Sequence, residues 1–139
     1  MYNLGITANG GEFMSFVWAS KKPRDGVATL YESNITLNKA ASTHFERAYS
    51  VLLGYDPDGQ RIAVKPISKE EVELGTISEE KRHKITVKSS YARVSNKKFM
   101  KEVASSANLD LVNGKSFKFK AVWSRPDSAL VIDLTNKEE

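Results

Sequence analysis

The sequence contains no cysteine and only two histidines. Without cysteine the chain can form no disulfide and offers no thiolate ligand to a metal, which fits a reducing cytosol. No apolar run approaches the length of a membrane-spanning helix, and the N-terminus lacks the positively charged region and long apolar core of a secretory signal. We therefore expect a cytoplasmic protein that does not enter a membrane.

Motifs of known catalytic chemistry are also absent. His44 and His83 do not share a metal-ligand spacing such as His-x-x-x-His, and we expect His83 to be an exposed linker residue. No Gly-rich phosphate loop precedes a helix, and no Gly-x-Ser-x-Gly elbow occurs. Asp56 and Asp58 begin like a calcium loop, but the later ligands are missing, so we interpret them as turn formers. The sequence predicts neither an enzyme nor a cofactor or metal site.

The composition is that of a soluble globular protein with a modest basic excess. A chain of 139 residues can bury a real core, either as one domain or as two half-size lobes. Its 40% hydrophobic and 27% charged residues are ordinary for such a protein. The net charge of +4 mildly favours an anionic partner such as nucleic acid.

A short pattern occurs twice along the chain. Residues 35–37 and 93–95 each indicate a short strand that runs into an Asn-Lys pair, Asn38-Lys39 and Asn96-Lys97. The Asn side chain can accept hydrogen bonds from the first free N–H groups of a helix, so each pair predicts a helix start. A helical pattern and two further strands follow in both places, and this repetition predicts a duplicated unit.

Alternation of apolar and polar residues predicts the individual elements. Strands are expected over residues 27–31, 35–37, 49–55, 62–66, 85–87, 91–94, 117–123 and 130–134. Residues 56–60 predict a hairpin turn, because Pro presets φ and Gly supplies a positive φ. Helices are expected from Lys39 to about Ala48 and from a cap at Ser95 or Asn96 through about Ala107. The second helix is expected to bury a stripe of Phe99, Val103 and Ala107, with Met100 and Ala104 beside it.

These elements divide the chain at a charged linker. Residues 68–84 carry clustered Glu, Lys and Arg with few large apolar groups, and Ser68 followed by Glu71 fits a capping box. The predicted organisation is an N-terminal segment 1–26, a first unit 27–67, a linker 68–84, a second unit 85–135 and a tail 136–139.

The stretch ITLNKAASTHFERAYSVLLGYDPDGQRIAVKPI, residues 35–67, resembles the core motif of the swapped-hairpin AbrB-like family, which includes the AbrB, MazE and MraZ types. Its end, Ile62-Ala63-Val64-Lys65-Pro66, is similar to the closing I-x-L-K-P strand of that family. The resemblance covers residues 27–67 strongly and 85–135 weakly. Two copies in one chain resemble the MraZ arrangement.

The resemblance implies an α+β, β-rich fold in which two tandem swapped-hairpin units form a pseudo-twofold β-barrel with short helices. One unit alone would leave open strand edges and too little apolar area to fold, so we expect the units to complete each other, and we expect a homo-oligomer through shared β-edges. Three positions depart from the family pattern: Ser33 and Asn34 stand where a Gly and a basic residue are usual, and Asn38 replaces the helix-start Pro.

The resemblance also implies a DNA-binding transcriptional regulator that contacts duplex DNA through a basic surface, since Lys and Arg neutralise phosphates. The candidate DNA-binding residues are Arg93, Lys97, Lys98 and Lys101 in the second unit, Lys39 in the first, and Lys21, Lys22 and Arg24 as an N-terminal arm.

The alternative is an antitoxin-like or assembly module of the same fold that binds a protein partner and no DNA. Three features favour it: the missing basic turn in the first unit, the acidic stretch 70–80, and the apolar run Phe16-Val17-Trp18 as an exposed anchor. Trp18 and Trp123 are otherwise expected to fill a core or an interface.

Overall fold

The computed structural model describes Phe16 and residues 25–138. The predicted arm of Lys21, Lys22 and Arg24, and the apolar residues Val17 and Trp18, lie outside the described residues.

The described chain is β-rich, with short helices between pairs of strands. The strands are β1 (Val27–Leu30), β2 (Asn34–Asn38), β3 (Ser50–Asp56), β4 (Arg61–Ile67), β5 (Ile85–Val87), β6 (Tyr91–Ser95), β7 (Phe117–Ser124) and β8 (Ala129–Lys137). The helices are α1 (Lys39–Ser42), α2 (Lys69–Glu73) and α3 (Lys97–Ala107), with single 3-10 turns at Thr43–Phe45 and Glu79–Lys81. Each predicted strand is present, and β8 continues into the residues predicted as a tail.

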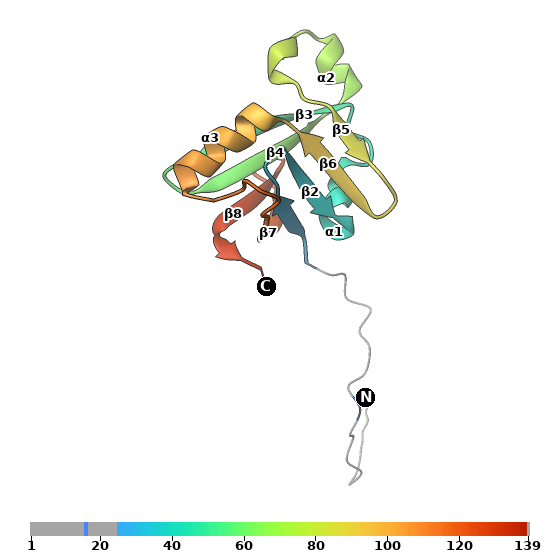
Figure 1. Cartoon of the computed structure of the whole chain (residues 1–139). Helices are drawn as coiled ribbons and strands as arrows, with labels where there is room; N and C mark the ends of the chain where they lie inside the picture. Colours follow the sequence, from blue (N-terminus) through green and yellow to red (C-terminus); the bar gives the residue numbers. More distant parts are fainter. Residues whose placement is uncertain (1–15, 17–24, 139) are drawn as a thin grey trace.

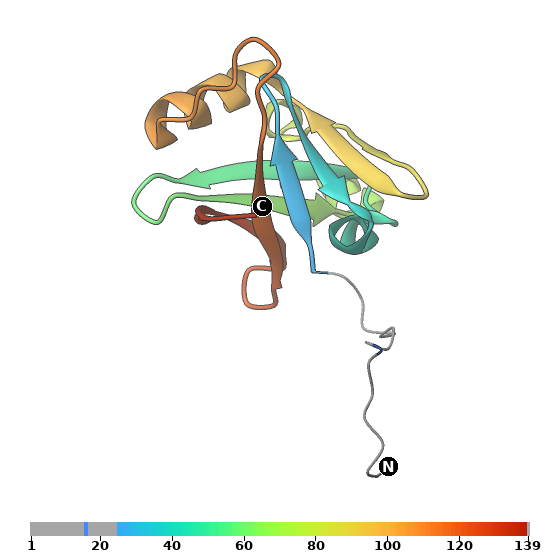
Figure 2. The ribbon, with the colours of Figure 1, turned by 60° about the horizontal axis from the view of Figure 1, so that its bottom comes forward.

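The strands form one eight-stranded sheet in the order β3-β4-β8-β7-β1-β2-β6-β5. Four hairpins build it, and hairpins from residues 27–67 alternate around the sheet with hairpins from residues 85–137. The β1–β2 hairpin therefore pairs with β7 on one side and β6 on the other, and makes no ladder with β3 or β4. Figure 2 shows the β3–β4 hairpin running crosswise to the β1–β2 hairpin.

The sheet curls into a nearly closed barrel, in which the end strand β3 meets the segment just before the other end strand, β5. The backbone N–H of Val51 in β3 donates to His83 two residues ahead of β5, at 2.9 Å, and the N–H of His83 donates back to Val51 at 2.8 Å. We call this pair of hydrogen bonds the seam. His83 is half-buried, so the prediction of an exposed linker residue was wrong: the linker returns to the sheet two residues before β5 begins.

Alternate strand residues fill the barrel. Ile35 and Leu37 of β2 are buried and pair with the buried Val94 and Ala92 of β6. The largest fully buried side chains include Ile62, Phe119 and Ile132 from β4, β7 and β8, together with Phe45 from the 3-10 turn after α1 and Met100 from α3. This alternation of buried and exposed positions confirms the period-two reading of the sequence.

Two asparagines start the helices, as predicted. Oδ1 of Asn96 accepts from the N–H of Phe99 at 2.9 Å and caps α3. Oδ1 of Asn38 accepts from the N–H of Ala41 and from the N–H of Val27, both at 3.0 Å, while its Nδ2 donates to the carbonyl of Asp25 at 3.0 Å. Asn38 thus joins the start of α1 to the start of β1.

Three local predictions have specific outcomes. The capping box of Ser68 and Glu71 is confirmed, on a helix α2 that has no buried residue. The first helix is shorter than predicted, because the α-helical turns end at Ser42 and a 3-10 turn follows. The predicted stripe on α3 is confirmed at Val103, which is fully buried, while Phe99 and Ala107 are half-buried against the core and Met100, expected beside the stripe, is buried.

Gly26 should not tolerate a side chain. Its carbonyl accepts from the N–H of Ala121 at 2.9 Å, and an added Cβ would collide with the backbone carbonyl oxygen of Ala121. We expect Gly26→Ala to lower the free energy of unfolding in urea by about 1–3 kcal/mol, the usual cost of overpacking. The control is Gly54→Ala, where the nearest atom to the added carbon is 4.0 Å away and no loss is expected. Equal stabilities would refute the close approach.

Removing the amide of Asn38 should destabilise the whole barrel. We expect Asn38→Ala to lower the free energy of unfolding by about 1–2 kcal/mol, since the cap and the tie to β1 are lost together. Ser68→Ala removes a comparable cap from α2, which has no buried residue, and should change the stability by less than about 0.5 kcal/mol. Thermal or urea unfolding of the two variants side by side tests the difference; a larger loss for Ser68→Ala would contradict it.

Candidate nucleic-acid interface

The outer face of β2, β6 and β5 is polar and positively charged. Because Ala92 and Val94 point into the core, Tyr91, Arg93 and Ser95 of β6 point outward. Arg93 lies between Thr36 of β2 and Thr86 of β5 in the ladder. Lys84 and Lys88 flank β5 and are exposed. The backbone N–H of Lys88 donates to the carbonyl of Tyr91 at 2.8 Å, which continues the pairing with β6. We call this surface the cationic sheet face; its members are Asn34, Thr36, Asn38, Lys84, Thr86, Lys88, Tyr91, Arg93 and Ser95.

The cationic sheet face holds three basic side chains and no acidic one. An anion laid across these strands would therefore meet positive charge and neutral hydrogen-bonding groups only. The two ion pairs found among the described residues, Arg61–Asp56 and Lys115–Asp110, lie elsewhere. None of the three basic side chains of this face takes part in an ion pair within the described residues.

Arg93 is held in the middle of the face by its neighbours. Its guanidinium carbon lies 5.2 Å from the ring centroid of Tyr91, a cation–π contact. Its Nε donates to Oγ1 of Thr36 at 3.5 Å, at the limit of a hydrogen bond. These contacts order the side chain without neutralising it, which suits recognition of a phosphate or a base edge.

The predicted site residues do not form one cluster. Lys39 follows Asn38, which pairs with Tyr91 at the start of β6, whereas Lys97, Lys98 and Lys101 follow the end of β6 on α3. α1 and α3 lie at opposite ends of β6 in Figure 1. All five predicted basic residues within the described chain are exposed: Lys39, Arg93, Lys97, Lys98 and Lys101.

Sequence reasoning missed Lys84 and Lys88. Lys84 was assigned to the linker, and Lys88 was passed over as part of a turn. The signal was the alternation from Lys84 to Lys88, in which Ile85 and Val87 are the inward positions. Read with period two, this stretch places both lysines on the same face as Thr86.

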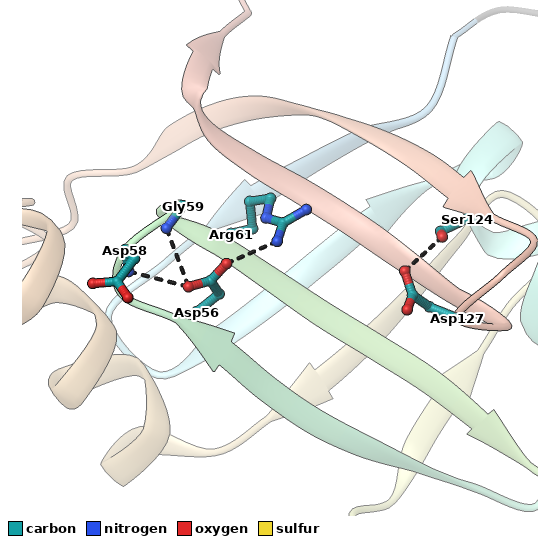
Figure 3. Close-up of polar contacts among 6 residues, drawn as sticks. All are labelled: Asp56, Asp58, Gly59, Arg61, Ser124 and Asp127. Carbon is teal, nitrogen blue, oxygen red and sulfur yellow. Dashed lines mark hydrogen bonds and ion pairs between the residues drawn. The ribbon is translucent and has the colours of Figure 1, made fainter.

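A second polar cluster lies on the outside of the barrel at the β3–β4 turn. Oδ1 of Asp56 accepts from the N–H groups of Asp58 and Gly59, both at 3.1 Å, and its Oδ2 contacts Arg61 at 2.8 Å. Figure 3 shows this turn and, apart from it, Asp127 of the β7–β8 turn, whose Oδ2 accepts from Ser124 at 2.7 Å. The carboxylate of Asp56 is used by the turn itself, which confirms its interpretation as a turn former.

Within residues 25–138 no group of three or more His, Asp or Glu side chains could hold a metal ion. His44 stacks on Trp123, with ring centroids 4.6 Å apart and planes inclined by 8°. Nδ1 of His83 lies 3.3 Å from Nδ2 of Asn96. Both histidines of the chain therefore have structural contacts.

None of the helices described here has the length and apolar character needed to cross a membrane. Comparison with known protein families, with curated proteins and with solved structures found no match to this chain.

The Asp56 turn predicts a pH dependence of stability. The hydrogen bond from Arg61, aided by the N–H of Gly59, holds the pKa of the Asp56 carboxyl below its ordinary 3.8. The charged form is thus favoured in the fold, and its contribution is present above pH 3.8 and lost as the pH falls through the folded-state pKa.

We expect Asp56→Asn to be less stable than the parent chain at pH 7 and equally stable once the carboxyl is protonated. Urea unfolding at a series of pH values measures this difference. Asp58→Asn is the matched control, because in Figure 3 its carboxylate points away from Asp56 and Arg61, and it should leave the stability at pH 7 unchanged. A constant difference between Asp56→Asn and the parent at every pH would contradict the assignment.

Proposed function

We propose that this protein is a duplex-DNA-binding regulator of transcription, of the swapped-hairpin AbrB-like type, acting in the cytoplasm as a binding protein rather than an enzyme. The observation that carries the proposal is the cationic sheet face, three basic side chains on adjoining strands with no acidic side chain among them.

The strand order supports the family assignment. Residues 27–67 and 85–137 each run strand, strand, helix, strand, strand. Their hairpins alternate around the sheet, so that the hairpins of one half are separated by those of the other. This is the arrangement expected of two tandem swapped-hairpin units that pair within one chain, as in the MraZ type.

The chemistry of the face suits a duplex. Lys84 and Lys88 would neutralise phosphates and release their counterions, which gives affinity that falls as salt rises. Phosphate contacts fix the position of the protein but carry no sequence information. Base reading would fall to Arg93 and to the neighbouring side chains of Asn34 and Thr36, whose amide and hydroxyl groups can form hydrogen bonds to base edges.

A second candidate function is assembly with another protein or with further copies of the same chain. Two observations favour it. The end strands β3 and β5 have a paired neighbour on one side only, apart from the seam, so they offer backbone groups to a further strand. Helix α2 exposes Glu70, Glu71 and Glu73 and has no buried residue. A discrete oligomer by light scattering together with no affinity for DNA would select this function.

Charge reversal on the cationic sheet face should abolish duplex binding. We expect the triple variant Lys84→Glu, Lys88→Glu, Arg93→Glu to lose binding in fluorescence anisotropy at low salt. For the parent chain, each phosphate contact should contribute about 0.9 to the slope of log affinity against log salt. The triple Lys97→Glu, Lys98→Glu, Lys101→Glu tests the helix separately.

The matched control is Lys65→Glu, Lys69→Glu, Arg125→Glu, which makes the same change in net charge on β4, on α2 and in the β7–β8 turn, outside this face. Circular dichroism of every variant verifies the fold. If the triple variant at Lys84, Lys88 and Arg93 binds a duplex as well as the control does, the cationic sheet face is not the interface. If only the helix variant loses binding, the contact surface is α3.

A further inference from the structure

A pocket of about 380 Å³ lies between α3 and the segment that follows it. Its apolar lining includes Met100 and Leu111, which are buried, and Val112, which is 49% exposed. Ala104 and Leu109 complete the apolar wall, and Glu32 of the β1–β2 turn lies at its edge. The volume is in the range of small-molecule sites.

The wall opposite α3 is held by its own hydrogen bonds. Helix α3 ends at Asn108, which adopts a left-handed conformation with φ of 62°, and the N–H of Leu109 donates back to Ala104 at 2.9 Å. Asp110 then accepts from Lys115 at 2.8 Å and from the N–H of Val112 at 3.4 Å. The pocket is therefore formed without a ligand, which lowers the entropic cost of binding.

The charge at this pocket is positive. Lys97 and Lys101 line it one helical turn apart, and neither takes part in an ion pair within residues 25–138. The carboxylate of Asp110 is occupied, because the hydrogen bond from Lys115 holds it and keeps its pKa below the ordinary value. When Glu32 is counted against one lysine and Asp110 against Lys115, one positive charge remains in excess at the pocket.

We propose that this pocket binds a small amphipathic carboxylate, with a short aliphatic chain against Met100 and Leu111 and its carboxylate at Lys97 and Lys101. The apolar lining supplies the hydrophobic part of the affinity. The two lysines select an anion over a neutral chain of the same length, because a lone carboxylate in an apolar pocket needs a countercharge.

The site also implies regulation. Lys97 and Lys101 are among the candidate DNA-binding residues, so a carboxylate held between them would reduce the positive charge that the duplex meets. This consequence rests on the proposed function and on contact of the duplex with α3, whereas binding of the carboxylate rests on neither.

The test is a titration of the full chain with octanoate, 1-octanol and inorganic phosphate, followed by NMR of the methyl groups. We expect octanoate to shift the signals of Met100, Leu111 and Val112 with saturation. The neutral alcohol and phosphate should each bind at least tenfold more weakly. Equal binding of octanoate and 1-octanol, or no saturable shift with octanoate, would overturn the proposal.

Two leucine variants on α3 separate the pocket from its surroundings. Ala104→Leu fills the pocket and should abolish octanoate binding, while Ser106→Leu adds the same side chain at an exposed position that does not line it. Lys97→Gln with Lys101→Gln should weaken octanoate by tenfold or more and leave 1-octanol unchanged. Undiminished octanoate binding by a folded Ala104→Leu would place the ligand elsewhere and refute the proposal.

Duplex anisotropy on the same variants distinguishes the two proposals. Octanoate should lower the duplex affinity of the parent chain and have no effect on Ala104→Leu. If octanoate binds and no form binds a duplex, the proposed function fails and the pocket assignment stands. If a duplex binds and octanoate does not, the pocket assignment fails alone.

Discussion

The structure depends on pairing between hairpins that are distant in the sequence. The β1–β2 and β3–β4 hairpins make no ladder with each other, and each completes its hydrogen bonds on β6, β7 or β8. An isolated hairpin is marginal in water, because it buries little apolar surface and leaves both edges unpaired. Neither half of the chain therefore has a sheet of its own. The core, the cationic sheet face and the pocket beside α3 all follow from this interleaving.

Features set by neighbouring residues could be predicted from the sequence. The turn at Asp56, the caps at Asn38 and Asn96 and the capping box at Ser68 each depend on side chains that bond to backbone a few residues away. The buried positions of the strands followed from alternation in the same way. The order of strands around the barrel could not be predicted in this way. The pairing of β2 with β6, for example, depends on how the strand edges of all four hairpins find hydrogen-bonding partners.

The residues that were misjudged are those whose surroundings come from distant parts of the chain. His83 was predicted to be exposed because its neighbours are charged, but β3 pairs with it across the seam. Lys84 and Lys88 were overlooked because β5 is only three residues long, too short for its alternation to stand out. On α3, periodicity predicted which residues contact the core, but packing decided that Met100 is buried more deeply than Phe99.

The seam also decides how the ring comes apart. Every other join between neighbouring strands is a ladder of at least three residue pairs, whereas β3 and the approach to β5 share one. The least costly opening of the molecule is therefore a break at that joint, which turns the cylinder into a curled ribbon while all four hairpins keep their partners. The opened sheet presents β3 along one border and β5 along the other, each with backbone N–H and C=O groups that lack a partner, one border from each half of the chain.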